Sequence, residues 1–142
     1  MRLDGKNRNL TTAALAALPR QEACATGKDS QAHTYQGVAL ADVLALVGAP
    51  HGKAIHGEAL ALVAEAADGY YVVFALPELD DAFASQAVLL ATARFGRPLL
   101  AESGPYQIIV PQEKRPARRM RQVRRLRLVR VPVQPGIFSV KR

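Results

Sequence analysis

Residues 114–130 read KRPARRMRQVRRLRLVR, and this stretch decides how the last fifth of the chain folds. Nine of its seventeen residues are Lys or Arg, and none is acidic. Pro116 prevents residues 114–119 from forming the interior of a helix, so a basic loop is predicted there. Residues 125–131 alternate Arg with Leu or Val, with one slip at Leu128–Val129, and this period of two predicts a strand with one buried face.

Three interpretations of the basic stretch are considered: a nucleic-acid-binding arm, a solvated tail, and the anion-binding edge of a folded site. A disordered arm or tail does not need the apolar residues of 125–131. Residues 107–137 also contain no Phe, Tyr or Trp on which bases could stack. We therefore expect the segment to fold back into the domain, and nucleic-acid binding is the least favoured of the three interpretations.

Charge is distributed unevenly along the 142 residues. Residues 1–113 carry 8 Lys or Arg and 12 Asp or Glu, whereas residues 114–142 carry 11 Lys or Arg and no acid. This asymmetry indicates an anionic ligand or an acidic partner. A hydrophobic content of 49% predicts a globular domain with a real core. No apolar run is long enough to span a membrane, and the first residues lack the apolar region of a signal peptide.

The body of the chain predicts short helices mixed with short strands. Thr11 or Thr12 is the expected N-cap of a helix that Pro19 ends. A second helix is predicted by one apolar stripe, made of Leu40, Val43, Leu44 and Val47. Strands are expected at residues 21–27, 32–37, 86–93 and 104–111 and on both sides of the Asp68-Gly69 turn. No linker or repeat interrupts this pattern, so we expect one α+β domain over residues 1–142.

Three segments taken together resemble the molybdopterin-binding domain of the sulfite oxidase family. The first is LAALPRQEACATG followed by TYQGVALADVLALVGAP, with a Leu-Pro helix end, a strand and a Gly-Val-x-Leu helix entry. The second is AADGYYVVFALPEL, which leads to VLLAT and FGRPLLAESGPYQIIVP. The third is the basic loop after Val110-Pro111, followed by the final strand. The resemblance extends from about residue 10 to residue 133.

This resemblance implies a sulfite-oxidase-like fold with a mixed, barrel-like β core and short helices. It also implies an oxidoreductase whose molybdenum is held by a pterin dithiolene and by one protein cysteine, with positive side chains on the pterin phosphate. A bacterial protein that is periplasmic in its mature form, with an electron-transfer partner, is implied as well.

The resemblance assigns candidate site residues to two places in the chain. Cys24, the single cysteine, lies where the family has its molybdenum ligand, although ATGKDS follows it in place of a Gly-Asn-Arg-like run. The alternative is a small buried strand residue. Lys114, Arg115, Arg118 and Arg119 occupy the loop where related proteins hold the cofactor, so an oxyanion clamp is expected there. The alternative for these four is a solvated basic loop.

Two functions stay open after this comparison. One is a molybdopterin-dependent oxidoreductase domain, with or without a complete metal site. The other is a cofactor-free module that binds a small anion or an acidic partner through residues 114–119, and the missing Gly-Asn-Arg run favours it.

Three smaller expectations concern residues outside this site. The wet face of an edge strand is expected to carry Arg125, Arg127 and Arg130. One of Tyr70 and Tyr71 is expected in the core and the other beside a pocket. No catalytic spacing is found among His33, His51 and His56.

Overall fold

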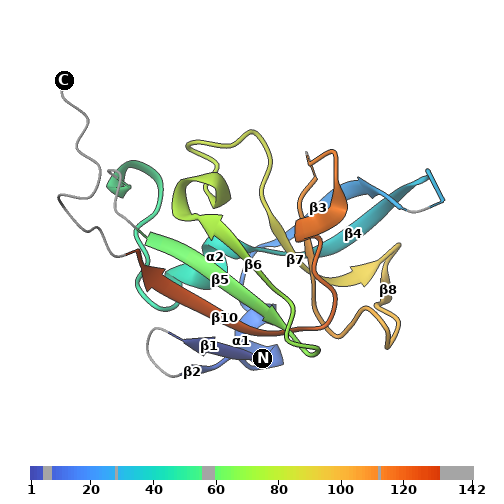
Figure 1. The fold of residues 1–142 in the computed structure, drawn as a ribbon, viewed down its shortest axis with the longest axis horizontal. Helices are drawn as coiled ribbons and strands as arrows, with labels where there is room; N and C mark the ends of the chain where they lie inside the picture. The colour runs from blue at the N-terminus through green and yellow to red at the C-terminus, as the bar shows by residue number, and fades with distance from the viewer. Residues whose placement is uncertain (5–7, 28, 56–59, 112, 132–142) are drawn as a thin grey trace.

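The computed structural model describes the whole chain except residues 5–7, 28, 56–59, 112 and 132–142, and it contains two β-sheets (Figure 1). The first sheet has the order β2-β1-β10-β5-β6 and contains β1 (Arg2–Asp4), β2 (Arg8–Asn9), β5 (Leu60–Ala66), β6 (Tyr71–Ala75) and β10 (Val123–Arg130). The second has the order β3-β4-β7-β8 and contains β3 (Arg20–Thr26), β4 (Ala32–Ala39), β7 (Leu89–Arg94) and β8 (Arg97–Pro98), with β9 (Gln107–Ile109) also paired to β7. Neighbouring strands are antiparallel except β1 and β10.

Short helical segments connect these strands, which confirms the predicted α+β class. They are α1 (Thr12–Ala16), α2 (Leu40–Ala45), η1 (Gly52–Ala54), η2 (Leu76–Leu79) and η3 (Pro116–Arg118). Thr11 caps α1 because its hydroxyl oxygen accepts a hydrogen bond from Ala14 N at 3.1 Å. The predicted stripe of α2 is confirmed, since Leu40, Val43 and Leu44 are fully buried. None of the helices in the described part of the chain has the length and apolar character needed to cross a membrane.

Strand β4 extends further toward α2 than the sequence predicts. Residues 37–39, expected at the helix entry, belong to β4 and pair with β7. Gly37 permits this pairing because a Cβ atom at this position would lie only 2.1 Å from Leu90 O. The helix therefore begins at Leu40, whose amide donates a hydrogen bond to Val88 O at 2.9 Å.

A single main core joins both sheets to α2. Its buried side chains include Leu44 from α2, Leu62 and Phe74 from the first sheet, and Leu90 and Ile108 from the second. Burying such large apolar side chains is the dominant favourable contribution to folding. The strands that approach the basic loop are thus fixed by the core on their inner faces.

The position of β10 corrects one expectation from the sequence. The strand lies between β1 and β5 (Figure 1), so its arginines are not on an edge strand. Its register shifts between Val123 and Arg125, and no shift occurs at residues 128–129. The predicted buried face is confirmed at Leu126, which is fully buried, whereas Val131 is 47% exposed. The N-terminal strand β1 pairs with the edge of β10 that was expected from the sequence to be exposed to solvent.

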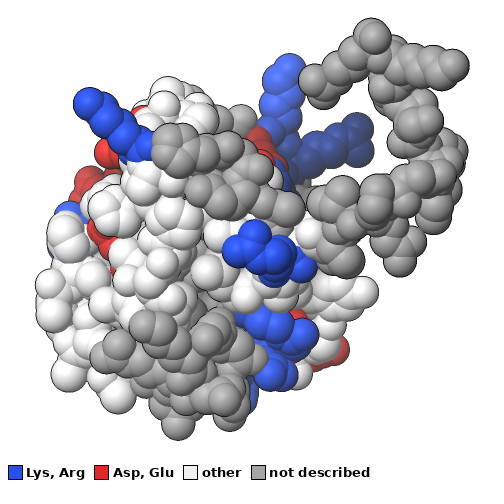
Figure 2. Space-filling model, turned by 90° about the vertical axis from the view of Figure 1, so that its left-hand side faces the viewer, with Lys and Arg blue, Asp and Glu red and all other residues white. Residues whose placement is uncertain are grey.

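Basic side chains form several separate groups on one side of the molecule. Figure 2 shows the side that lies to the left in Figure 1, and uncharged residues separate the Lys and Arg groups there. A nucleic-acid backbone is bound through a continuous line of phosphate contacts. Among the described residues, this side therefore presents separate basic groups and not one continuous basic surface.

Candidate functional site: an arginine-lined pocket beside the β5–β6 turn

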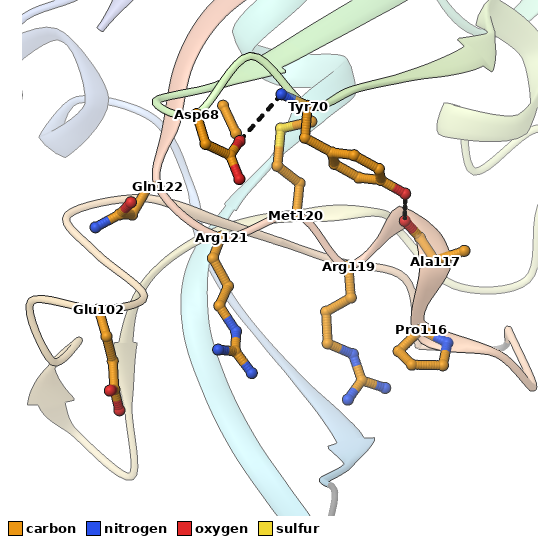
Figure 3. A pocket seen from close by; sticks show the side chains of 10 residues that line it. Asp68, Tyr70, Glu102, Pro116, Ala117, Arg119, Met120, Arg121 and Gln122 are labelled. Atoms are coloured by element: carbon orange, nitrogen blue, oxygen red, sulfur yellow. Dashed lines mark hydrogen bonds between the residues drawn. The ribbon is translucent and has the colours of Figure 1, made fainter.

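A pocket of about 430 Å³ opens where the β5–β6 turn meets the segment that leads into β10 (Figure 3). Residues 116–117 and 119–122 form one wall, and Ala66, Asp68 and Tyr70 form another, with Glu102 at the margin. A volume of this size lies within the range of roughly 300–1,000 Å³ that is typical of small-molecule sites. We call this space the arginine pocket because Arg119 and Arg121 both line it.

Arg119 and Arg121 line the arginine pocket and point in the same direction, away from Asp68 and Tyr70 (Figure 3). Figure 3 shows their guanidinium groups side by side, with Met120 between them turned the other way. Met120 is only 2% exposed and therefore anchors this part of the wall in the core. Successive side chains point to opposite sides here, so the residues before and after buried Met120 both reach the same opening. Two positive groups are thus placed together.

Hydrogen bonds hold the walls of the arginine pocket together. Tyr70 donates through its hydroxyl to Ala117 O at 2.7 Å, and its amide donates to Asp68 Oδ1 at 3.0 Å. Gln122 O accepts from Ala67 N at 3.0 Å, and Met120 O accepts from Ile108 N at 2.8 Å. The turn role predicted for Asp68 is confirmed by its bond to Tyr70 N. The prediction that one of the two tyrosines is core is wrong, because Tyr70 is 50% exposed and Tyr71 65% exposed.

Arg119 has hydrogen-bonding capacity that the protein does not use. Its Nη1 donates to Thr26 O, at the end of β3, over 2.6 Å. Its Nε is buried and has no hydrogen-bond partner among the described residues. A buried donor without an acceptor costs free energy, so this side chain is held at an energetic cost to the fold. Arg121, by contrast, is exposed.

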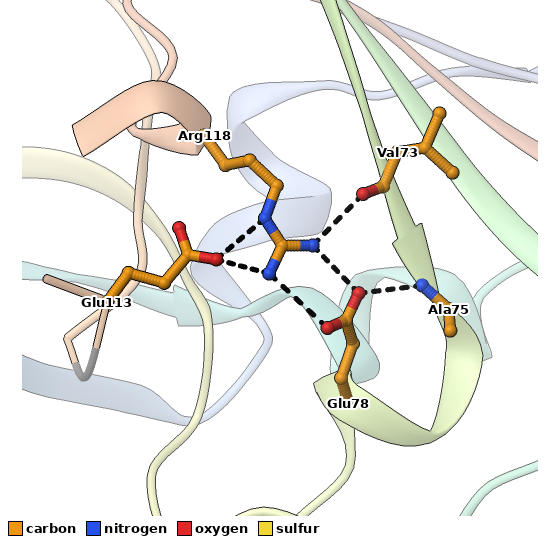
Figure 4. A network of polar contacts seen from close by, with 5 residues as sticks. All are labelled: Val73, Ala75, Glu78, Glu113 and Arg118. Atoms are coloured by element: carbon orange, nitrogen blue, oxygen red, sulfur yellow. Dashed lines mark hydrogen bonds and ion pairs between the residues drawn. The ribbon is translucent and has the colours of Figure 1, made fainter. Parts of the chain in front are cut away.

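Arg118 points away from the arginine pocket into a network of acceptors (Figure 4). Its guanidinium donates to Glu78 Oε1 at 2.8 Å, to Glu113 Oε1 at 2.7 Å and to Val73 O at 3.0 Å. It also lies 4.4 Å from the centre of the Phe74 ring. The hydrogen bond with Glu78 and, after it, that with Glu113 raise the pKa of Arg118 further above its ordinary value, although burial acts against them. This side chain is thus committed to protein partners.

The other predicted site residues lie outside the lining of the arginine pocket. Lys114 and Arg115 are exposed on the same loop. Cys24 is exposed on β3, an edge strand, and its Sγ lies 3.7 Å from Thr34 Oγ1, so it is not the buried strand residue of the alternative interpretation. Within the described residues, no group of three His, Cys, Asp or Glu could hold a metal ion. Arg119 lines the pocket and donates a hydrogen bond to the carbonyl oxygen of Thr26, two residues after Cys24. Arg119 therefore connects β3 to the pocket.

Neither His33 nor His51 lines the arginine pocket. His33 contacts Asp29 at 3.0 Å, and this bond, with that from Gln31 N, lowers the pKa of Asp29. His51 lines a second pocket of about 470 Å³ together with Asp80, whereas His56 lies outside the described residues. Burial would raise the pKa of Asp80, but hydrogen bonds from Gly52 N at 2.8 Å and Ala82 N at 2.9 Å lower it overall.

Sequence reasoning missed Arg121 and Glu102, whereas the place beside a pocket that was expected for one of the two tyrosines is occupied by Tyr70. A signal for Arg121 was present, since apolar Met120 between two arginines is the same period-two pattern that predicts β10. The inward position of Arg118 had no local signal. Its partner Glu78 is forty residues away in the sequence and becomes a neighbour only in the folded chain.

A solved structure, the sulfane dehydrogenase SoxCD from Paracoccus pantotrophus, is similar with a TM-score of 0.63 and 22% sequence identity over 84% of this chain. This chain spans 34% of the length of that one, and the likeness supports the fold alone. Curated protein sequences gave no match. The sequence model for the oxidoreductase molybdopterin binding domain matches residues 4–136, and the chain therefore belongs to this family.

Proposed function

We propose that this domain binds a molybdopterin-type cofactor for an oxidoreductase, and that the arginine pocket receives the phosphate-bearing pterin. The observation that carries this proposal is the presence of two guanidinium groups, those of Arg119 and Arg121, at one opening. Two guanidinium groups at one opening are suited to bidentate contacts with a phosphate. The family to which the chain belongs supplies the class of ligand.

The charges around the arginine pocket also suit the two ends of a pterin phosphate. In the view of Figure 3, Glu102 and Arg119 lie on opposite sides of Arg121. A pterin ring presents amino and ring N–H donors, which carboxylate oxygens of Glu102 and Asp68 can accept. The phosphate, at the other end of the ligand, would bind Arg119 and Arg121. A pocket with both signs of charge therefore favours this ligand over a simple anion.

The metal end of such a cofactor would depend on Cys24, the single thiol of the chain. Arg119 bonds to Thr26 O, and Thr26 follows Cys24 by two residues on the same strand. A ligand that fills the pocket and continues along Arg119 would therefore approach the exposed face of β3. When bound, the cofactor supplies oxygen-atom or electron transfer, while the protein supplies binding and orientation.

The proposal is tested by the pterin and metal content of protein purified from a molybdenum-replete host. We expect wild-type protein to carry pterin, detected as its fluorescent oxidation product, and molybdenum in equal amounts. The double variant Arg119→Ala/Arg121→Ala should lose both by about tenfold, because each lost charged hydrogen bond weakens binding substantially. Arg115→Ala removes one charge from the same loop outside the pocket and should retain the cofactor. Absence of pterin from wild-type protein, or equal content in every variant, would contradict the proposal.

A second function, a cofactor-free module for small anions, is favoured by one observation. Cys24 is exposed outside the lining of the arginine pocket. If this function holds, phosphate, sulfate or sulfite raises the melting temperature of the chain, because a ligand of the native state stabilises it. Pterin would then give no larger shift than these anions, and Cys24→Ser would leave all the shifts unchanged. A shift with pterin alone would instead support the cofactor site.

A further inference from the structure

The helical turn η3, which carries Arg118 and leads directly to Arg119, has no buried residue. Packing into the core therefore cannot fix its position, in contrast to Met120, which follows it and is buried. Its position depends on polar contacts with neighbouring elements. Two such contacts reach it from the β6 side, the hydroxyl of Tyr70 on Ala117 O and the guanidinium of Arg118 on Val73 O.

The contacts of Arg118 form an unbroken connection from the first sheet to the arginine pocket. Ala75, the last residue of β6, donates through its amide to Glu78 Oε1 at 2.8 Å. The same oxygen accepts from Arg118 Nη1 at 2.8 Å, as Figure 4 shows. A backbone amide thus fixes the Glu78 carboxylate, and this carboxylate in turn binds Arg118. One peptide bond joins Arg118 to Arg119. A displacement of Glu78 would be passed to the pocket wall.

Electrostatics gives the cluster of Arg118, Glu78 and Glu113 a second effect on the arginine pocket. Residues 114–121 carry five Lys or Arg and no acid, so their mutual repulsion opposes a compact loop. The two carboxylates of the cluster offset the charge of Arg118 inside the fold. Arg118 therefore adds less repulsion to the pair of Arg119 and Arg121 than an unpaired arginine at this position would.

We infer that Arg118 is a positioning residue, which fixes η3 through Glu78 and Glu113 so that Arg119 is preorganised for an anion. This inference rests on the proposed function of the arginine pocket. It assigns no contact with the ligand to Arg118, whose guanidinium is occupied by protein acceptors. The cluster lowers the cost of ordering the binding residues when the ligand arrives.

The test compares two conservative variants in the full chain, with inorganic phosphate as the probe. Glu78→Gln keeps the size of the side chain and removes one charge from the cluster. Glu65→Gln is the matched control, because it breaks the pair of Glu65 with Arg127 at 3.0 Å, which is similarly exposed and does not line the pocket. We expect the Kd for phosphate, measured by calorimetry, to rise roughly five- to tenfold in Glu78→Gln and to stay unchanged in Glu65→Gln.

A second measurement does not depend on the ligand. The Nε–H resonance of Arg119 should be slow to exchange with solvent in wild-type protein, and it should lose this protection in Glu78→Gln and in Glu113→Gln but not in Glu65→Gln. If both cluster variants lower only the melting temperature and leave the Kd and the Arg119 resonance unchanged, Arg118 has a structural role alone and the inference is overturned. If wild-type protein does not bind phosphate, the proposed function fails, while the Arg119 resonance still decides whether the cluster positions this side chain.

Discussion

The two halves of the basic stretch, residues 114–122 and strand β10, have similar compositions but are held in different ways. In β10, backbone pairing with β1 and β5 fixes the chain, and Leu126 anchors it in the core. In residues 114–122, side-chain contacts such as those of Tyr70 and Arg118 and single backbone hydrogen bonds hold the chain, and only Met120 is buried. The strand half contributes stability, whereas the loop half leaves arginines free for a ligand. Similar arginine content therefore serves two purposes in adjacent segments.

The largest expected effect is in the strand half. Leu126→Ala should lower the free energy of unfolding by about 2–5 kcal/mol, because it leaves a cavity at a fully buried position. Val131→Ala, which truncates an exposed side chain just beyond the same strand, should change it by less than about 0.5 kcal/mol. Chemical denaturation measures both values. Equal losses from the two substitutions would show that β10 is not anchored through its buried face.

An intermediate effect on the free energy of unfolding is expected from removing an arginine of the loop half, in comparison with removing one of the strand half. Arg118→Ala should cost about 1–3 kcal/mol of unfolding free energy, because it leaves two part-buried carboxylates without their common partner. Arg127→Ala breaks the pair with Glu65, a single carboxylate, and should cost about 0–1 kcal/mol. Chemical denaturation at low and at high salt measures the stability cost of each substitution. A cost for Arg127→Ala as large as that for Arg118→Ala would contradict the distinction between the halves.

The smallest effect on stability, and a large one on binding, is expected from Arg121→Ala. Arg121 is exposed at the arginine pocket, so its loss should change the free energy of unfolding by less than about 0.5 kcal/mol. Phosphate affinity should nevertheless fall by about tenfold. Arg124→Ala removes an exposed arginine of β10 that does not line the pocket and should alter neither quantity. Titration calorimetry gives the affinities, and equal binding by the two variants would place the anion elsewhere.

The comparison also explains which features could be predicted from the sequence. The strand character of residues 125–131 and the Asp68-Gly69 turn depend on local patterns, and both are present in the structure. The central place of β10 could not be predicted, because its partner β1 lies at the other end of the chain and is only three residues long. The site was predictable as a basic loop, but the direction of each arginine depends on distant acceptors such as Glu78 and Thr26.

The parallel pairing of β1 with β10 has a consequence for the order of folding. Arg2 is paired with Arg125, so the centre of the first sheet joins segments from opposite ends of the described chain. Before β10 enters, β1 and β5 each present an unpaired edge, and such edges favour association with other chains. Contacts between residues this distant in sequence form slowly, because a long loop must close first. During synthesis, the first sheet can close only after β10 has left the ribosome, and the arginine pocket, whose wall precedes β10, is completed at the same late stage.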